Sequence, residues 1–201
     1  MNFLAHLLLS GDKPDWIVGG LLGDFVKGPL KGQYSTGIEA GIRLHRKIDL
    51  FTDQHPHIKH CQTFFGPELR RFSGIIVDIG FDHFLAKHWH RFDDRELTKF
   101  NSEVLTILNQ YGPQIPSNAS LFIDRMTSHD ILLRYRDAEA IPQILKRTGQ
   151  RLSRPTPLIE SGEHFLQQYS RLETVFFEFF PELVAFALKQ RGVLIGDQRE
   201  D

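Results

Sequence analysis

Apolar side chains recur every three or four residues along most of the chain, which is the period of an amphipathic α-helix. The C-terminal part shows this period most clearly. There, seven apolar residues share one predicted helix face: Phe165, Tyr169, Leu172, Phe176, Phe179, Leu183 and Phe186. Pro181 lies within this segment, and we expect it to bend or split the helix.

Proline and capping residues predict where other helices begin. Pro14 and Pro56 can each occupy a first helical turn, where the missing N–H costs nothing. Two further starts are predicted by the capping boxes Thr36-x-x-Glu39 and Asp93-x-x-Glu96.

The segment 73–81 is β-branched and flanked by glycine, and by itself it could form a strand. The chain has no second segment of this character, and a lone strand leaves its backbone groups unpaired. We therefore predict a helix, running from Pro67 to about Trp89. The expected fold class is all-α, with about seven to nine helices in a single compact domain spanning residues 1–201.

Composition narrows the class of protein. The formal net charge is −1 and 41% of residues are hydrophobic, so nucleic acid is not an expected partner. No apolar run approaches the roughly 20 residues that cross a bilayer, so no membrane partner is expected. Cys61 is the only cysteine and cannot form an internal disulfide, which favours the reducing cytoplasm.

Histidine is distributed unevenly, with eight of the ten in residues 1–90. His45 and Asp49 stand four residues apart on one predicted helix face, and Asp53 continues that face by one turn. Imidazole and carboxylate groups in such a row suit a divalent transition metal. A solvated ion pair on a helix surface is the alternative. Asp24, which follows an apolar segment, is either an exposed helix end or a further ligand.

A second row of candidates lies in the ambiguous segment. Asp78 and Asp82 are one turn apart among apolar residues, and His83 and His88 follow. Buried carboxylates are costly unless they are paired or bind a metal, so the row favours a metal site. His6 lies among leucines and is either a core residue or another ligand. No common nucleophile motif is present, which leaves metal-activated water as the expected nucleophile.

Four motifs, in the same order, resemble those of the acyl carrier protein phosphodiesterases: MNFLAHL at 1–7, GLLGDFVKG at 20–28, GIRLHRKIDLFTD at 41–53 and DIGFDHFLAKHW at 78–89. The resemblance continues through RYRD at 134–137 and the aromatic C-terminal helix. It implies a fold distantly related to the HD-domain metal phosphohydrolases. It also implies removal of 4′-phosphopantetheine from a serine of holo acyl carrier protein, with Mn²⁺ as the favoured ion.

The resemblance puts one or two metal ions on the matched positions, held by a subset of His6, Asp24, His45, Asp78, Asp82 and His83. Asp49 is then expected to orient His45 or accept a proton, Arg46 to hold the phosphodiester, and His88 to protonate the departing serine oxygen. The adjacent His-Asp pair of the HD superfamily is reversed in the matched motif, as Asp82-His83, and the pair His129-Asp130 lies outside it.

An acidic carrier protein would need a basic patch on this nearly neutral chain. The cations next to the expected ligands are its candidates: Lys27, Lys31, Arg43, Arg46 and Lys47. Two other functions remain open: hydrolysis of a small nucleotide or phosphoester by the same chemistry, and a helical binding module without activity.

Overall fold

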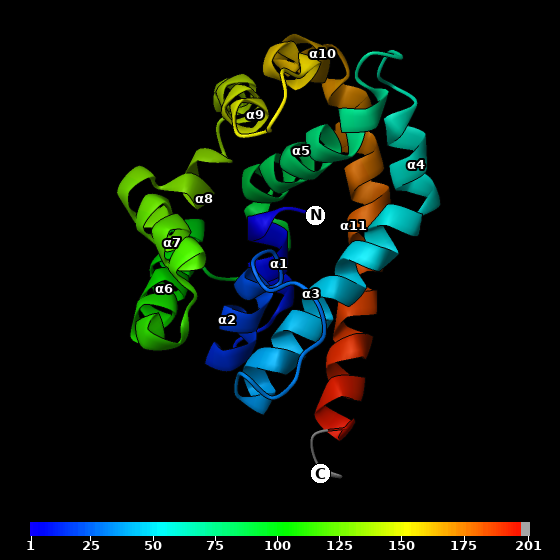
Figure 1. Ribbon diagram of the computed structural model, residues 1–201. Coiled ribbons are helices and arrows are strands. Elements are labelled where there is room, and N and C mark those ends of the chain that lie inside the picture. The colour runs from blue at the N-terminus through cyan, green and yellow to red at the C-terminus, as the bar shows by residue number, and fades with distance from the viewer. Residues whose placement is uncertain (198–201) are drawn as a thin grey trace.

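The structure is a computed structural model that describes residues 1–197, and Figure 1 shows how its helices are arranged. The α-helices are α1 (Phe3–Leu9), α2 (Pro14–Leu22), α3 (Thr36–Gln54), α4 (Pro56–Gln62), α5 (Ser73–Lys87), α6 (Leu97–Gln110), α7 (Ser117–His129), α8 (Ile131–Arg134), α9 (Ile141–Gln150), α10 (Gly162–Gln167) and α11 (Tyr169–Asp197). The 3₁₀ helices are η1 (Arg70–Phe72), η2 (Trp89–Arg91), η3 (Gly112–Gln114), η4 (Ala138–Ala140) and η5 (Pro157–Glu160).

The all-helical prediction is confirmed for residues 1–197, in which no strand occurs. The ambiguous segment 73–81 lies in α5. The predicted number of helices is wrong, because the described residues form eleven α-helices, several of them short. The last residues of the predicted domain, 198–201, lie outside the described part. No helix among those described is both long and apolar enough to cross a bilayer.

The capping box at Thr36 is wrong by one residue. The N-cap of α3 is Ser35, whose hydroxyl accepts a hydrogen bond from the N–H of Ile38 at 3.3 Å. Glu39 instead accepts the N–H of Gly32 at 2.8 Å and pairs with Arg43 at 2.9 Å. The Glu39 carboxylate therefore ties the loop before α3 to the helix, rather than capping the helix itself.

Two other predicted starts are also wrong. Pro67 lies in a turn, and α5 begins only at Ser73, after η1. Asp93 accepts the N–H of Arg95 at 2.8 Å, two residues on, which is a local turn. Glu96 is the residue that precedes α6. In both cases a turn competes with the helical conformation close to the helix start.

The aromatic C-terminal segment is helical as predicted, but it divides at Gln168, between α10 and α11. Pro181 does not split it, because α11 continues through that residue. Phe179, Phe180 and Leu183 are fully buried around the proline. We attribute the continuity of α11 to this packing, which offsets the hydrogen bond that proline cannot make.

Glycines bring α2 and α3 into backbone contact. A methyl group on Gly19 would collide with the backbone of Ile38 and Gly41, and one on Gly41 would lie 2.6 Å from the carbonyl oxygen of Trp16. Larger residues would hold the two helices apart. In Figure 1, α1 lies between this pair and α5, so segments far apart in the sequence meet around α1.

Candidate metal centre

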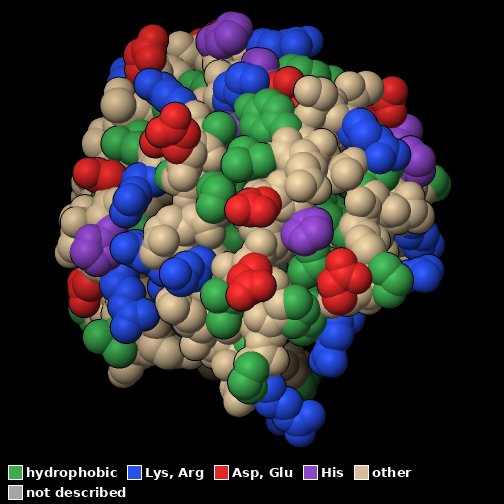
Figure 2. Space-filling model, turned by 90° about the horizontal axis from the view of Figure 1, so that it is seen from above, with side chains coloured by type: hydrophobic (Ala, Val, Ile, Leu, Met, Phe, Trp, Pro, Cys, Tyr) green, Lys and Arg blue, Asp and Glu red, His purple; other side chains and the backbone are tan. Residues whose placement is uncertain are grey.

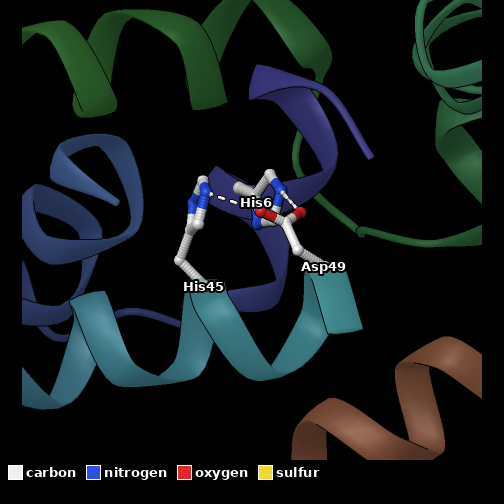
Figure 3. A group of neighbouring side chains, drawn as sticks. All are labelled: His6, His45 and Asp49. Atoms are coloured by element: carbon white, nitrogen blue, oxygen red, sulfur yellow. Dashed lines mark ion pairs between the residues drawn. The ribbon is translucent and has the colours of Figure 1, made fainter. Parts of the chain in front are cut away.

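Three potential ligands converge where α1 faces α3: one comes from α1 and two come from α3. The Nε2 atom of His6 lies 3.0 Å from Oδ1 of Asp49, and Nε2 of His45 lies 3.1 Å from Oδ2 of the same carboxylate. One ligand atom from each residue lies within 4.8 Å of the other two. Figure 3 shows the carboxylate facing both rings. His45 and Asp49 share a face of α3, as their spacing predicted, and His6 on α1 completes the group.

The His6 side chain has nitrogen atoms without hydrogen bonds. It is 2% exposed, and within residues 1–197 neither ring nitrogen forms a hydrogen bond, although Nε2 lies 3.0 Å from Asp49. Its ring stacks on that of His45, with centroids 3.7 Å apart and planes inclined by 17°. An unpartnered buried polar atom is costly. A cation at this position would satisfy it.

The ring of His45 is held in one tautomer. Its Nδ1 lies 2.7 Å from the carbonyl oxygen of Gly20, and a carbonyl can only accept, so Nδ1 carries the hydrogen. In the neutral ring, Nε2 then presents a lone pair toward the Asp49 carboxylate. Two acceptors this close repel each other unless a proton or a metal ion lies between them.

The protonation states also suit a metal ion. Burial, together with the neighbouring His45, lowers the pKa of His6 to about 3, so that imidazole is neutral near pH 7. Burial alone would raise the pKa of Asp49, but its contacts with His45 and His6 outweigh burial and hold that pKa well below the usual range. A neutral imidazole and an ionised carboxylate are the forms that bind divalent metals.

Asp24 and Asp78, two of the other predicted ligands, border this group. Asp24 follows α2 and its Oδ1 lies 3.8 Å from Nε2 of His45. Burial raises the pKa of Asp24, against the opposing effects of His45 and Lys27. Asp78 lies 3.1 Å from the α-amino group of Met1, which is itself 3.8 Å from Asp49. Both carboxylates are partly exposed.

Asp82 and His83 have other partners. The Asp82 carboxylate is fully buried and accepts the N–H groups of Leu4 at 2.7 Å and Ala5 at 3.1 Å, at the N-terminus of α1. Burial raises the pKa of Asp82 to about 7, although both hydrogen bonds oppose the shift. The nitrogens of His83 contact the carbonyl of Tyr135 and the hydroxyl of Tyr169, each at 2.7 Å.

Arg46 and His88 also lie in specific contacts. Arg46 donates to the carbonyl oxygen of Val26 at 2.9 Å, two residues after Asp24. His88 contacts Glu173 of α11 at 2.7 Å. Neither side chain is among those that line the cleft described next.

A cleft of about 560 Å³ opens beside the metal centre. Asp24 and Asp78 line it, together with apolar residues such as Phe3 and Ile144. Four arginines from α7, α8, α9 and the turn after α9 also line it: Arg125, Arg134, Arg147 and Arg151. None of these arginines was predicted as a site residue. Arg134 opens the RYRD motif, and Arg147 and Arg151 stand four residues apart, but only the fold brings all four together.

Two residues of the basic patch expected from the sequence have partners within the protein. Arg43 pairs with Glu39 at 2.9 Å, and Lys47 donates to the side chain of Gln190 at 2.8 Å. Lys27 is exposed and close enough to influence Asp24.

Comparison with known proteins agrees with the four motifs. The family model described as acyl carrier protein phosphodiesterase matches residues 1–183. The acyl carrier protein phosphodiesterase of Escherichia coli O157:H7 (strain EC4115 / EHEC) is 34% identical over 195 residues, which cover 94% of this chain and 99% of the relative. The protein of the same name from Shigella boydii serotype 18 is 35% identical over 192 residues, covering 93% and 97%. No solved structure matches the chain. The chain therefore belongs to the acyl carrier protein phosphodiesterase family.

Proposed function

We propose that this protein hydrolyses the phosphodiester between 4′-phosphopantetheine and a serine of holo acyl carrier protein, releasing apo carrier protein and 4′-phosphopantetheine. The observation that carries the proposal is the group His6, His45 and Asp49 beside an open cleft, in a member of this family. Two imidazoles and an ionised carboxylate form a donor set for a divalent ion next to a space for substrate.

In this proposal His6, His45 and Asp49 hold the ion, and Asp24 and Asp78, which line the cleft, are further candidates. The mixed nitrogen and oxygen donors are compatible with Mn²⁺. When bound, such an ion lowers the pKa of water and offsets charge on phosphoryl oxygens. Asp49 thus has a direct ligand role here, in place of the orienting role expected from the sequence.

We assign the remaining residues to proton transfer or to the positioning of other side chains. Asp24 is 43% exposed, lines the cleft and has a pKa raised by burial. As an alternative to binding the ion, Asp24 therefore suits the role of accepting a proton from an attacking water. Arg46 holds the backbone at Val26 and so positions Asp24, rather than clamping the phosphate. His83 and His88 join α5 to α11 through Tyr169 and Glu173, and we leave them and Asp82 outside the ligand set.

The decisive experiment is intact-protein mass spectrometry of holo acyl carrier protein after incubation with the purified protein. We expect loss of the phosphopantetheine mass in the presence of Mn²⁺, and no loss with a chelator or with the Asp49→Asn variant. Holo carrier protein that keeps its full mass under all conditions would contradict the proposal.

A small phosphoester is the alternative substrate, because a cleft of about 560 Å³ is in the size range of small-molecule sites. Release of phosphate or nucleoside from nucleotides, without any change in holo carrier protein, would favour it. A distant relation to the HD-domain phosphohydrolases is also part of the proposal, supported by the helical His/Asp group. The free, buried Cys61 is compatible with action in the reducing cytoplasm.

A further inference from the structure

The four arginines of the cleft form a surface that we call the arginine rim: Arg125, Arg134, Arg147 and Arg151. All four are exposed. In the part of the chain that the structure describes, none of their guanidinium groups has an ion-pair or hydrogen-bond partner. By contrast, other arginines of the protein are paired, as Arg43 is with Glu39 and Arg95 is with Asp93.

The acidic residues among the cleft lining are Asp24 and Asp78. Within residues 1–197 they contact His45 and the α-amino group of Met1 and form no ion pair with the rim. Unpaired like charges around one concave surface produce a positive potential that attracts anions. Basic side chains are numerous on the left of the face shown in Figure 2, the side on which α7, α8 and α9 lie in Figure 1.

The number of arginines identifies the kind of anion. A phosphodiester carries one negative charge, and the proposed function places it at the metal centre. Four exposed guanidinium groups on separate elements can pair with several acceptors spread over a surface. Arginine pairs well with carboxylates, often through two hydrogen bonds. An acidic protein surface supplies acceptors of this kind and distribution.

We propose that the arginine rim docks an acidic face of the protein part of the substrate, so that the phosphodiester reaches the metal centre through the cleft. This inference rests on the proposed function for the identity of the docked protein. The cleft of about 560 Å³, with apolar lining residues that include Phe3, Ile79 and Ile144, would then take the flexible arm that carries the phosphodiester.

The test uses charge reversal in the full-length protein. The variant Arg147→Glu/Arg151→Glu alters two exposed residues of the rim. Its matched control is Lys146→Glu/Arg154→Glu, which changes the net charge equally at two exposed residues outside the cleft lining. Kinetics are measured with holo acyl carrier protein, and binding is measured with apo carrier protein, which lacks both arm and phosphate. Bis(4-nitrophenyl) phosphate serves as the small substrate.

We expect the rim variant to raise the KM for holo carrier protein about tenfold or more, with kcat changed less than about twofold, because like charges then face each other at the interface. Binding of apo carrier protein should weaken in parallel, and the control should behave as wild type. Hydrolysis of the small diester should fall much less than that of holo carrier protein, because the small diester makes no contact with a docked protein. A rim variant with normal KM and binding would overturn the docking role, as would an equal loss in the control or with the small diester.

The binding measurement with apo carrier protein distinguishes this inference from the proposed function. Wild-type protein that binds carrier protein without cleaving it, and loses binding in the rim variant, contradicts the function and supports docking. If wild type and the rim variant cleave holo carrier protein equally well, the result supports the function and overturns docking. Absence of both binding and cleavage overturns both.

Discussion

The Nδ1 atom of His45 lies 2.7 Å from the carbonyl oxygen of Gly20, which ties an imidazole on α3 to the backbone of α2. The bond fixes the tautomer and directs Nε2 toward Asp49. It depends on the close contact of the two helices at Gly19 and Gly41. Gly19, just before the second motif, and Gly41, the first residue of the third, thus have a direct consequence for the chemistry of the site.

Gly23→Ala should inactivate the protein without removing any polar group. A methyl group at Gly23 would collide with the ring of His45, and displacement of a catalytic group by about 1 Å can cost about 100-fold in rate. Gly74→Ala is the control, because a methyl group there meets no atom within 4 Å. Turnover of holo carrier protein measures the effect. A Gly23→Ala protein with normal turnover would show that the ring has room to move.

Asp49→Asn should lower both bound metal and turnover. The amide cannot supply two anionic oxygens to His6 and His45, so we expect a loss of about 100-fold or more in turnover, the scale seen when a key electrostatic group is removed. Mass spectrometry measures the bound metal, and circular dichroism shows whether the variant remains folded. Asp53→Asn, one turn along α3 and exposed, is the matched control. Equal metal content in both variants would remove Asp49 from the ligand set.

Asp82→Asn should reduce stability rather than metal binding. Asp82 accepts two N–H groups at the start of α1, and an amide replaces one acceptor by a donor that faces a second donor. Loss of a helix cap costs about 1–2 kcal/mol, which urea unfolding can measure. If instead the variant loses its metal while its unfolding midpoint is unchanged, Asp82 is a ligand after all.

His6 should make the metal-free protein sensitive to acid. Its pKa is about 3 in the folded state, against 6.5 for the ordinary value, so the unfolded state binds the extra proton between these limits. This contribution to stability is complete above pH 6.5 and is lost as the pH falls toward 3, with a slope of at most about 1.4 kcal/mol per pH unit.

Urea unfolding in chelator, from pH 7 down to about pH 4, tests this linkage. The free energy of unfolding of His6→Gln should fall less steeply with acid than that of wild type. His90→Gln, at an exposed position, should retain the wild-type slope. Parallel curves for wild type and His6→Gln would show that His6 is not held neutral by burial.

Much of the fold followed from local pattern. The 3.6-residue period predicted an all-helical chain and the aromatic C-terminal helix, and Pro14 and Pro56 do begin α2 and α4. The errors occurred at helix boundaries. Ser35, rather than Thr36, caps α3, and Asp93 forms a turn instead of a cap. Such choices depend on single hydrogen bonds between alternatives of similar free energy, so local sequence does not decide them.

The arrangement of the site shows what the sequence by itself determined. The spacing of His45 and Asp49 on one face of α3 required no tertiary information. Asp78 and Asp82 have the same spacing on α5, and the sequence pattern predicted both equally as ligands. The tertiary structure separated them: Asp78 lines the cleft, whereas Asp82 is buried against the N–H groups of α1.

The same distinction applies to the wider site. His6 joined His45 and Asp49, and four arginines from α7 to the turn after α9 met at one cleft, only through helix packing. Helical periodicity fixes which side chains share a face, because it is set by the backbone repeat. Which helix covers that face is decided by long-range packing between segments far apart in the sequence, and no local pattern encodes that contact.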